Sequence, residues 1–445
     1  MSSESSMGPD GRAPRELKYL PDWLWDFYAQ IFEIIFLKGA SWPLQLLQAH
    51  VVFVPKPGGD STSPANLRPI TILSAAYRVF SSCLFANLMP WHDAWCPTNI
   101  CGGRPGADAL STAMELGFTL EEAIVLQRKG LIMVSLDLSK FFDSIEWNLI
   151  LGLAQEFGLP QSYLSAFRRF LQGLQRKLKV GGTFSPEWFT ASCGTPQGDA
   201  LSILWANLAS CVLVKSLQMA PVAIASRIYV DDRYLWVNKV PHLKEALSLV
   251  SKFDQLAKNR LNKDKTNILC SPTYLRSKVR KITFDGHPLN PVHSLKGLGC
   301  TLSSVRKPCR AIPNDRAAKA LKTAKRAKSS IAPWAFRKRV LASKIIPRLV
   351  YGGALSKPSN AITRSLRARS ARLIWGRARS KRATEMVYLT LLRPSRTDPE
   401  TAHAVSTILT ILRGLVQSPK LEILLARIGK LSAATKGLQA SFPTL

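Results

Sequence analysis

The chain is short of acidic residues, with 29 Asp and Glu against 61 Lys and Arg among 445 residues. The formal net charge at pH 7 is therefore +32. Such an excess of one sign indicates a polyanionic partner and does not point to a particular fold. Nucleic acid is the first candidate for that partner, and an anionic membrane surface is the second. The length is sufficient for two or three domains with a large core.

Paired cysteines and a leader segment are also missing. The eight cysteines are scattered, with no C-x-x-C pair and no Cys/His spacing of a zinc site, which favours the reduced, mostly buried thiols of an intracellular protein. The polar start, residues 1–6, is unlike a signal peptide. The most apolar early run, residues 23–37, contains Asp26 and Glu33, whereas a membrane span carries few or no charges over about 20 residues. We therefore expect no membrane partner.

Two adjacent acids stand out against this basic background. Asp231 and Asp232 follow the apolar residues Ile228 and Val230 and precede the run 234–237, which is rich in aromatics. This pattern predicts a strand, a tight turn and a second strand. Taken alone, the pair is explained by a hairpin with two solvated turn carboxylates. The alternative is a hairpin tip that holds a divalent metal, since Mg²⁺ prefers carboxylate oxygens together with substrate phosphates.

A third carboxylate favours the metal-binding alternative. The apolar run 131–134 predicts a buried strand, and that strand leads to Asp137. Asp143 has a simpler explanation, because Asp143-x-x-Glu146 resembles a capping box at the start of a helix that Gly158 ends. We therefore assign Asp137 to chemistry and Asp143 to helix capping.

A loop with the sequence Gly-Thr-Pro-Gln-Gly occupies residues 194–198, between these two sites. Apolar residues then recur at helical spacing over 201–212, with Asp199 as the expected N-cap. A glycine-bearing loop that enters a helix can bind an anion or lie close to a nucleotide. The position of this loop between the Asp137 strand and the hairpin at 231–232 favours a functional role for the motif.

In chain order the three motifs are LDLSKFFD at 136–143, GTPQG at 194–198 and YVDD at 229–232. Together they resemble the active-site motifs of reverse transcriptases, and most of all those of non-LTR (LINE-type) retrotransposons. The resemblance covers roughly residues 20 to 380. It implies an α+β right-hand polymerase with fingers, an antiparallel-sheet palm and a helical thumb.

On such a fold the chain divides into four parts. Residues 1–48 would form a disordered start, up to about residue 16, and a helical extension. Residues 49–130 would form the fingers, and 131–302 the palm, with some helices that contact the fingers and two short strands near 176–180 and 187–192. Residues 303–445 would form a basic helical thumb and a C-terminal tail.

The resemblance implies RNA-directed DNA polymerase activity, with an RNA template, a DNA primer and dNTPs as partners. Two Mg²⁺ ions, or Mn²⁺ as a substitute, would assist the attack of the primer 3′ hydroxyl on the α-phosphate. Asp137 and Asp231 would be the bridging ligands, and Asp232 a weaker ligand. Lys265 lies in a segment that resembles the family's Asn-x-x-Lys-Thr and would protonate the leaving pyrophosphate. On the sequence alone, a solvated loop lysine explains Lys265 equally well.

Five further residues would bind the incoming nucleotide. Lys56 and Arg68 fall in PKPG and LRPI segments that resemble the fingers region facing the triphosphate, although a solvated charge explains either cation alone. Phe142 falls where the family has its aromatic steric gate, which would exclude a ribose 2′ hydroxyl. Gln197 and Gly198 would line the nascent base pair.

Two segments would hold the primer and its duplex. Leu298 and Gly299 lie in an LKGLG segment that resembles the primer grip. Basic residues dominate residues 306–382, and four of them fall near one face of a predicted helix: Arg316, Lys319, Lys322 and Arg326. A solvated face is the ordinary explanation of a charge run. One sign dominates so heavily here that we expect contacts with duplex phosphates.

The chain departs from the family pattern at two sites. Gly103 replaces the aromatic residue of a segment that usually reads Gly-Phe-Arg and guides the template, and Ala-Leu-Ser-Ile at 200–203 replaces Pro-Leu-Ser-Pro. We expect no endonuclease region before residue 20, and no zinc knuckle or RNase H after the thumb. We expect a polymerase with a separate or missing endonuclease, or a fragment of a polyprotein. In a eukaryote it would lie in the nucleus or with its RNA.

Two other protein classes stay open. A non-catalytic or maturase-like RNA-binding protein on the same fold would be marked by the loss of an active-site Asp, and none is lost here. An RNA-directed RNA polymerase usually carries Gly-Asp-Asp instead of Tyr-Val-Asp-Asp, and an Asp or Asn system for the ribose instead of Phe142.

Overall fold

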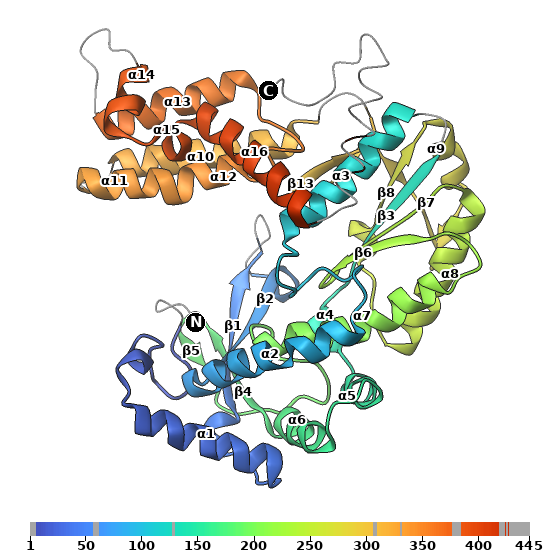
Figure 1. Ribbon diagram of the computed structural model, residues 1–445, viewed down its shortest axis with the longest axis vertical. Coiled ribbons are helices and arrows are strands. Elements are labelled where there is room, and N and C mark those ends of the chain that lie inside the picture. Colours follow the sequence, from blue (N-terminus) through green and yellow to red (C-terminus); the bar gives the residue numbers. More distant parts are fainter. Residues whose placement is uncertain are drawn as a thin grey trace.

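The computed structural model describes residues 6–56, 62–126, 130–305, 309–329, 332–375 and 384–417, together with residues 423 and 426. Figure 1 shows two sheet-containing parts, drawn mainly in blue to yellow, and a group of orange and red helices at one end. We call these parts the fingers, the palm and the thumb.

The fingers sheet has four strands in the order β2-β1-β4-β5. The strands are β1 (Gln48–Pro55), β2 (Leu67–Leu73), β4 (Gln175–Val180) and β5 (Thr183–Phe184). β1 pairs with β2 antiparallel and with β4 parallel. The predicted strand at 176–180 is therefore confirmed, but it joins the fingers sheet. The predicted strand at 187–192 is wrong, because that segment makes a single bridge between Phe189 and Arg176.

The palm sheet has five strands in the order β11-β8-β3-β7-β6. The strands are β3 (Leu131–Asp137), β6 (Ala225–Tyr229), β7 (Asp232–Val237), β8 (Asn267–Ser271) and β11 (Pro291–Val292). All pairings are antiparallel except that of β11 with β8. Residues 131–134 are buried in the central strand, as the apolar run predicts. Two small hairpins follow, β9 (Thr283–Phe284) with β10 (His287–Pro288) and β12 (Ser294–Gly297) with β13 (Cys300–Ser303).

Helices surround the two sheets and build the thumb. The fingers and palm helices are α1 (Asp22–Leu37), α2 (Ala75–Trp95), α3 (Ala109–Leu126), α4 (Phe141–Ser144), α5 (Trp147–Glu156), α6 (Gln161–Gly173), α7 (Ala200–Gln218), α8 (Val240–Leu256) and α9 (Tyr274–Val279). The thumb helices are α10 (Ala311–Ser329), α11 (Trp334–Val340), α12 (Ile346–Val350), α13 (Asn360–Trp375), α14 (Thr384–Met386), α15 (Pro394–Thr397) and α16 (Pro399–Gln417).

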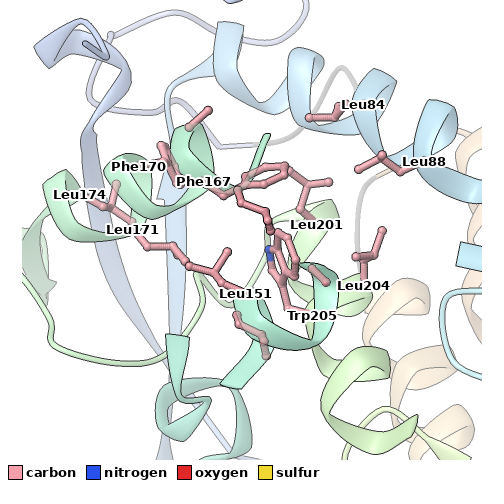
Figure 2. Packing of buried hydrophobic residues seen from close by; sticks show 14 of the residues in the cluster. Leu84, Leu88, Leu151, Phe167, Phe170, Leu171, Leu174, Leu201, Leu204 and Trp205 are labelled. Atoms are coloured by element: carbon pink, nitrogen blue, oxygen red, sulfur yellow. The ribbon is translucent and has the colours of Figure 1, made fainter. Parts of the chain in front are cut away.

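A large apolar core joins fingers and palm around α7. Figure 2 shows side chains from four helices that meet there: Leu84 and Leu88 of α2, Leu151 of α5, Phe167 and Phe170 of α6, and Leu201, Leu204 and Trp205 of α7. Each such side chain stabilises the fold by about 1.5–3 kcal/mol when it is fully buried. This core fixes the loop that precedes α7 relative to both sheets.

Helix α7 is long and apolar enough to cross a membrane, but 72% of its most apolar window is buried inside the fold. A core helix of a soluble protein passes the same test of length and composition. Five of the eight cysteines are also buried, and none of the eight is in a disulfide.

The N-terminal segment differs from the expectation of a disordered start. Among residues 6–16, Asp10 Oδ2 accepts a hydrogen bond from the backbone N–H of Ala75 at 2.6 Å, and Arg78 donates to the carbonyl of Ser6 at 2.8 Å. A carboxylate at the first turn of α2 is favourable because the free N–H groups there carry partial positive charge. The prediction of disorder is therefore wrong for residues 6–16, and residues 1–5 lie outside the described part.

The thumb has an apolar core of its own. Ala317, Ala320 and Ala324 of α10 are buried in it against the neighbouring helices α12 and α13. Lys319, Lys322 and Arg326 are exposed on the same helix.

Candidate active site

Three carboxylates meet where β3 ends and the β6–β7 hairpin turns. The register of β3 and β7 pairs Asp137, the last residue of β3, with Asp232, the first residue of β7. Asp231 lies in the turn between β6 and β7. The expectation that a strand end and a hairpin tip bring their carboxylates together is thus confirmed by the backbone pairing.

The turn of this hairpin is held in an uncommon conformation. Val230 has φ 58°, in the left-handed region that β-branched residues rarely adopt. A β-carbon at Gly102 would lie 2.6 Å from Val230 Cγ2 and 2.9 Å from its backbone N, so the residue at 102 must be glycine. Backbone hydrogen bonds from Cys101 to Ile228 and from Ile228 to Asn99, of 2.8 and 2.9 Å, fix the same segment beside β6. The surroundings therefore enforce the turn that carries Asp231.

The pKa values of Asp231 and Asp232 are both raised, by burial first and by neighbouring carboxylates second. Burial, followed by the charges of Asp231 and Asp137, raises the pKa of Asp232 to about 7. Burial is also the largest cause of the raised pKa of Asp231, to which Asp137 adds, while Arg68 and Lys265 act in the opposite direction. Adjacent carboxylates disfavour ionisation unless cations compensate them. The cluster therefore attracts positive charge.

Lys265 supplies part of that charge. Its Nζ lies 3.0 Å from Asp137 Oδ2. The loop before it runs along the end of β3, because the N–H of Asn262 donates to the Asp137 carbonyl at 2.8 Å and that of Ser139 donates to Arg260 at 2.7 Å. Within the described part of the chain, no three His, Cys, Asp or Glu side chains are already arranged as a metal site.

One predicted triphosphate-binding cation, Arg68, lies on the fingers strand β2, and the other, Lys56, directly follows the neighbouring strand β1. Arg68 is exposed on β2, and its charge acts on Asp231. Lys56 follows β1, where its N–H donates to the Asn66 carbonyl at 2.8 Å. The rest of the predicted loop at 57–61 lies outside the described residues. The structure thus brings Arg68 towards the carboxylates.

Phe142, Gln197 and Gly198 line one cavity between α2 and the loop before α7. The N–H of Thr71 on β2 donates to the Gln197 carbonyl at 2.8 Å, which ties this loop to the fingers sheet. The N–H of Thr195 donates to the Phe142 carbonyl at 2.8 Å. Three residues predicted to contact the nucleotide are therefore brought together.

Asp143 does not cap a helix, so that prediction is wrong. It lies inside the short helix α4, and the chain leaves helical geometry at Ile145 before α5 begins. Ile145 is extended there, and its carbonyl accepts the N–H of Gly194 at 2.8 Å. Glu146 accepts from Lys258 at 3.1 Å and makes no side-chain bond to the start of α5. The capping-box pattern fails because tertiary contacts divide the predicted helix into two.

Gly194 explains why α4 and the loop lie so close together. It has φ +84°, and a β-carbon there would meet the Asp143 carbonyl oxygen at 2.6 Å. Trp147 also donates from its indole N–H to the Gly194 carbonyl at 2.7 Å. Burial raises the pKa of Asp143, and the neighbouring Arg176 lowers it. The backbone of Asp143 therefore packs against Gly194, and the residue remains accessible to solvent.

Asp199 occupies the predicted N-cap position of α7, but it is also fully buried. Tyr77 of α2 lies beside it, with its hydroxyl 3.5 Å from Asp199 Oδ2. Burial raises the pKa of Asp199 to about 6. No local sequence pattern marks Tyr77 as a partner, because the contact joins segments that are 122 residues apart.

Arg233 is a second residue that the sequence analysis missed. It follows Asp232 on β7, is only 1% exposed, and donates to Asp254 of α8 at 2.7 Å. Successive residues of a strand point to opposite faces, so Asp232 faces the carboxylate cluster and Arg233 faces the core. The sequence signal for this buried ion pair was a charged residue, Arg233, within the otherwise largely apolar strand sequence DRYLWV.

The predicted duplex-binding cations do not form one set. Lys319 pairs with Asp315 at 2.7 Å on the exposed side of α10. Arg316 is half-buried, and its guanidinium donates to the carbonyls of Gly299 and Tyr351. Arg316 is therefore directed at Gly299 and Tyr351 and does not share the exposed side of α10 with the other three cations, whose contact with duplex phosphates stays a prediction.

Comparisons with known proteins agree with the site. Residues 54–302, more than half of the chain, match the family described as reverse transcriptase (RNA-dependent DNA polymerase). A retrovirus-related Pol polyprotein from the type-2 retrotransposable element R2DM of Drosophila melanogaster is 25% identical over 280 residues, 60% of this chain and 25% of that protein. One from the type-1 element R2 of Nasonia vitripennis is 25% identical over 256 residues, 55% of this chain and 24% of that protein.

The match spans only about a quarter of the length of these two curated relatives. Among solved structures, the apo telomerase from Candida Tropicalis aligns with a TM-score of 0.45 at 12% identity, over 94% of this chain and 72% of that chain.

Proposed function

This chain belongs to the reverse transcriptase (RNA-dependent DNA polymerase) family, and on that premise we propose that it extends a primer 3′ hydroxyl with dNTPs on an RNA template. The observation that carries the proposal is the meeting of Asp137, Asp231 and Asp232 at one edge of the palm sheet. The cavity lined by Phe142, Gln197 and Gly198 supports it.

Reverse transcriptases generally use divalent metals, and the donors at this site fit such ions. The three carboxylates offer only oxygen ligands, which Mg²⁺ prefers, and the raised pKa values of Asp231 and Asp232 reflect negative charge that a cation would relieve. We propose that these residues hold two Mg²⁺ ions, with Mn²⁺ as a substitute. Bound ions supply electrostatic stabilisation of the attacking and leaving oxygens.

The protein's own cations complete the chemistry. The primer 3′ oxygen loses its proton to solvent and forms a bond to the α-phosphorus, and the bond from that phosphorus to the pyrophosphate oxygen breaks. We assign Lys265 to protonate the departing oxygen, since its ammonium group lies at the carboxylate cluster. Arg68 suits the triphosphate because a guanidinium binds phosphate oxygens with two parallel hydrogen bonds.

Discrimination between sugars is assigned to Phe142. Its ring lines the same cavity as Gln197 and Gly198, so a 2′ hydroxyl on a nucleotide in that cavity would collide with the aromatic edge. A deoxyribose carries hydrogen at this position and fits. The proposed substrates are therefore dNTPs.

Primer extension on an RNA template with Mg²⁺, comparing dNTPs with rNTPs, tests the proposal. Extension with dNTPs that stops when EDTA is added supports it. Binding of the primer-template without extension would favour a non-catalytic RNA-binding protein, and preferential use of rNTPs would favour an RNA-directed RNA polymerase.

A further inference from the structure

The turn between β12 and β13 has a conformation that requires support. Leu298 has φ 48° and Gly299 has φ 77°, so both residues are in the left-handed region. A leucine in this region is strained by about 1–2 kcal/mol. We name Leu298 and Gly299 the grip turn. Its geometry depends on what surrounds it.

Two thumb side chains hold the carbonyls of the grip turn. Arg316 of α10 donates to the Gly299 carbonyl and, through Nη1, to the Tyr351 carbonyl at 2.7 Å. The Tyr351 hydroxyl donates to the Leu298 carbonyl at 3.0 Å. The guanidinium carbon of Arg316 also lies 4.7 Å from the centre of the Tyr351 ring. Arg316 and Tyr351 therefore contact each other, and each of them binds one carbonyl of the grip turn.

Close packing interlocks the same segments. A β-carbon at Gly299 would meet Arg316 Nη2 at 3.0 Å and Tyr351 Cε1 at 3.3 Å. A β-carbon at Gly352, which has φ +72°, would meet Cys300 Sγ at 2.8 Å and Arg316 Nη1 at 3.4 Å. Glycines thus let the thumb approach the hairpin closely enough for the guanidinium to reach two carbonyls.

On the palm side, the grip turn is adjacent to the strand that carries Asp232. A β-carbon at Gly297 would meet the Tyr234 hydroxyl at 2.9 Å, and Tyr234 follows Asp232 by two residues on β7. Residues two apart on a strand point to the same face. Contacts therefore run from the carboxylate cluster through Tyr234 to the grip turn, and from there to Arg316 and Tyr351.

We propose that Arg316 and Tyr351 are positioning residues that fasten the grip turn to the thumb, so that the thumb's hold on the duplex sets the place of the primer end. The placing of the primer end by these residues rests on the proposed function. The attachment of the grip turn to the thumb does not depend on it. Arginine is suited to this link because its fork of donors binds two carbonyls at once, whereas the single ammonium of lysine lacks that geometry.

The state of the Tyr351 hydroxyl is compatible with this role. Burial, with Cys300 as a smaller cause, raises the pKa of Tyr351 to about 12. The hydroxyl therefore remains a donor across the pH range of ordinary assays. Asp108 and Tyr229 also raise this pKa, whereas the charge of Arg316 lowers it.

Arg316→Lys is the main test variant because it keeps the charge and removes the fork. Tyr351→Phe removes one hydroxyl and little else. Lys325→Arg is the control, since Lys325 is exposed on the same helix, keeps its charge in this variant and is assigned no contact. The first measurement is hydrogen exchange of the amides of residues 294–303 in the full chain without nucleic acid. We expect Arg316→Lys to speed exchange roughly tenfold, Tyr351→Phe by about 2- to 10-fold, and Lys325→Arg to leave it unchanged.

The second measurement is the dependence of extension on primer-template concentration. Arg316→Lys should raise the KM for primer-template by roughly tenfold while kcat changes less than about threefold, because the link positions the primer and takes no part in bond making. Unchanged exchange and KM in both Arg316→Lys and Tyr351→Phe would overturn the proposal, as would an equal effect of Lys325→Arg. If the parent protein extends no primer, the proposed function fails, and the exchange result still decides whether the link exists.

Discussion

Gly103 and Ile203 lie against each other, so that a β-carbon added at Gly103 would overlap Cγ2 of Ile203. These residues occupy the two segments at which the sequence departs from the reverse transcriptase pattern, with glycine in place of an aromatic residue and isoleucine in place of the second proline. The two departures therefore share one contact, in which the isoleucine occupies space beside a residue that has no side chain. Ile203 also lines the cavity that contains Phe142 and Gln197.

The first prediction concerns this contact. Gly103→Ala should destabilise the protein by about 2–4 kcal/mol, because alanine is strained at φ +74° and its β-carbon meets Ile203. Adding Ile203→Ala should recover about 1 kcal/mol of that loss in a double-mutant cycle. Gly158→Ala is the matched control, because Gly158 has φ +81° and open space around it. Urea unfolding measures all four variants, and equal losses at both glycines would refute the contact.

A second prediction concerns the carboxylate cluster. Asp137→Asn and Asp231→Asn should each abolish primer extension and leave nucleic-acid binding nearly unchanged, because both side chains are assigned to hold metal and neither is assigned to grip the duplex. Asp143→Asn is the control, since Asp143 lies on α4, apart from the paired strand ends that carry Asp137 and Asp232, and it should retain most activity. Extension assays and anisotropy titrations separate the two effects. Full primer-extension activity of purified Asp231→Asn would contradict the proposal that the protein is a polymerase.

The third prediction tests the gate. Phe142→Ala or Phe142→Val should raise the ratio of rNTP to dNTP incorporation, because the ring excludes the 2′ hydroxyl by bulk and neither variant alters a carboxylate. Competition between the two nucleotides on the same primer-template gives that ratio directly. No change in the ratio would mean that Phe142 only packs between Phe141 and the cavity.

The fourth prediction concerns the exposed cations of α10. Replacing Lys319, Lys322 and Arg326 together with Gln should reduce the slope of log K against log salt by about 2–3 on a duplex, at roughly 0.9 per phosphate contact. Binding should weaken alike for all sequences, and extension at saturating primer-template should survive. Fluorescence anisotropy at several salt concentrations measures the slope. If the slope does not change, the duplex-binding surface lies elsewhere, and the basic residues after 360 become the next candidates, although 376–383 are outside the described part.

The fifth prediction follows from the buried carboxyl of Asp199. Its pKa is raised to about 6 by burial from a usual value of 3.8, so the folded state holds this proton more tightly than the unfolded state. Its stabilising effect is complete below about pH 4 and is lost as the pH rises through 6. Asp199→Asn has no such proton and should gain roughly 1–3 kcal/mol relative to the parent between pH 4 and 7. Parallel stability curves over that range would contradict the assignment.

The order of the active-site motifs was predictable because local patterns carry it. A buried apolar strand that ends in an acid and a hairpin with an acidic tip each have a signature within a few residues, and pairing of their strands brings Asp137 and Asp232 together. The position of Asp199 at the start of α7 was predictable for the same reason.

The remaining features depend on contacts between distant segments. β4 joins the fingers sheet through parallel pairing with β1, more than 120 residues away. Arg316 turns towards the grip turn because two glycines allow the approach, and nothing in the spacing of α10 distinguishes it from Lys319. The helix predicted to start at Asp143 is interrupted at Ile145, whose carbonyl accepts a hydrogen bond from the N–H of Gly194.

The neighbouring charges of Asp232 and Arg233 also protect the hairpin from misassembly. A shift of β7 by one residue against β3 would turn every side chain to the opposite face. Arg233 would then leave Asp254 without its partner and point into the carboxylate cluster, while Asp232 would be buried among apolar side chains. An unpaired buried charge is strongly destabilising, so a slipped hairpin is disfavoured while the sheet forms. Asp232, on one face of β7, is assigned to the proposed chemistry. Arg233, on the opposite face, selects the correct alignment of β7 with β3.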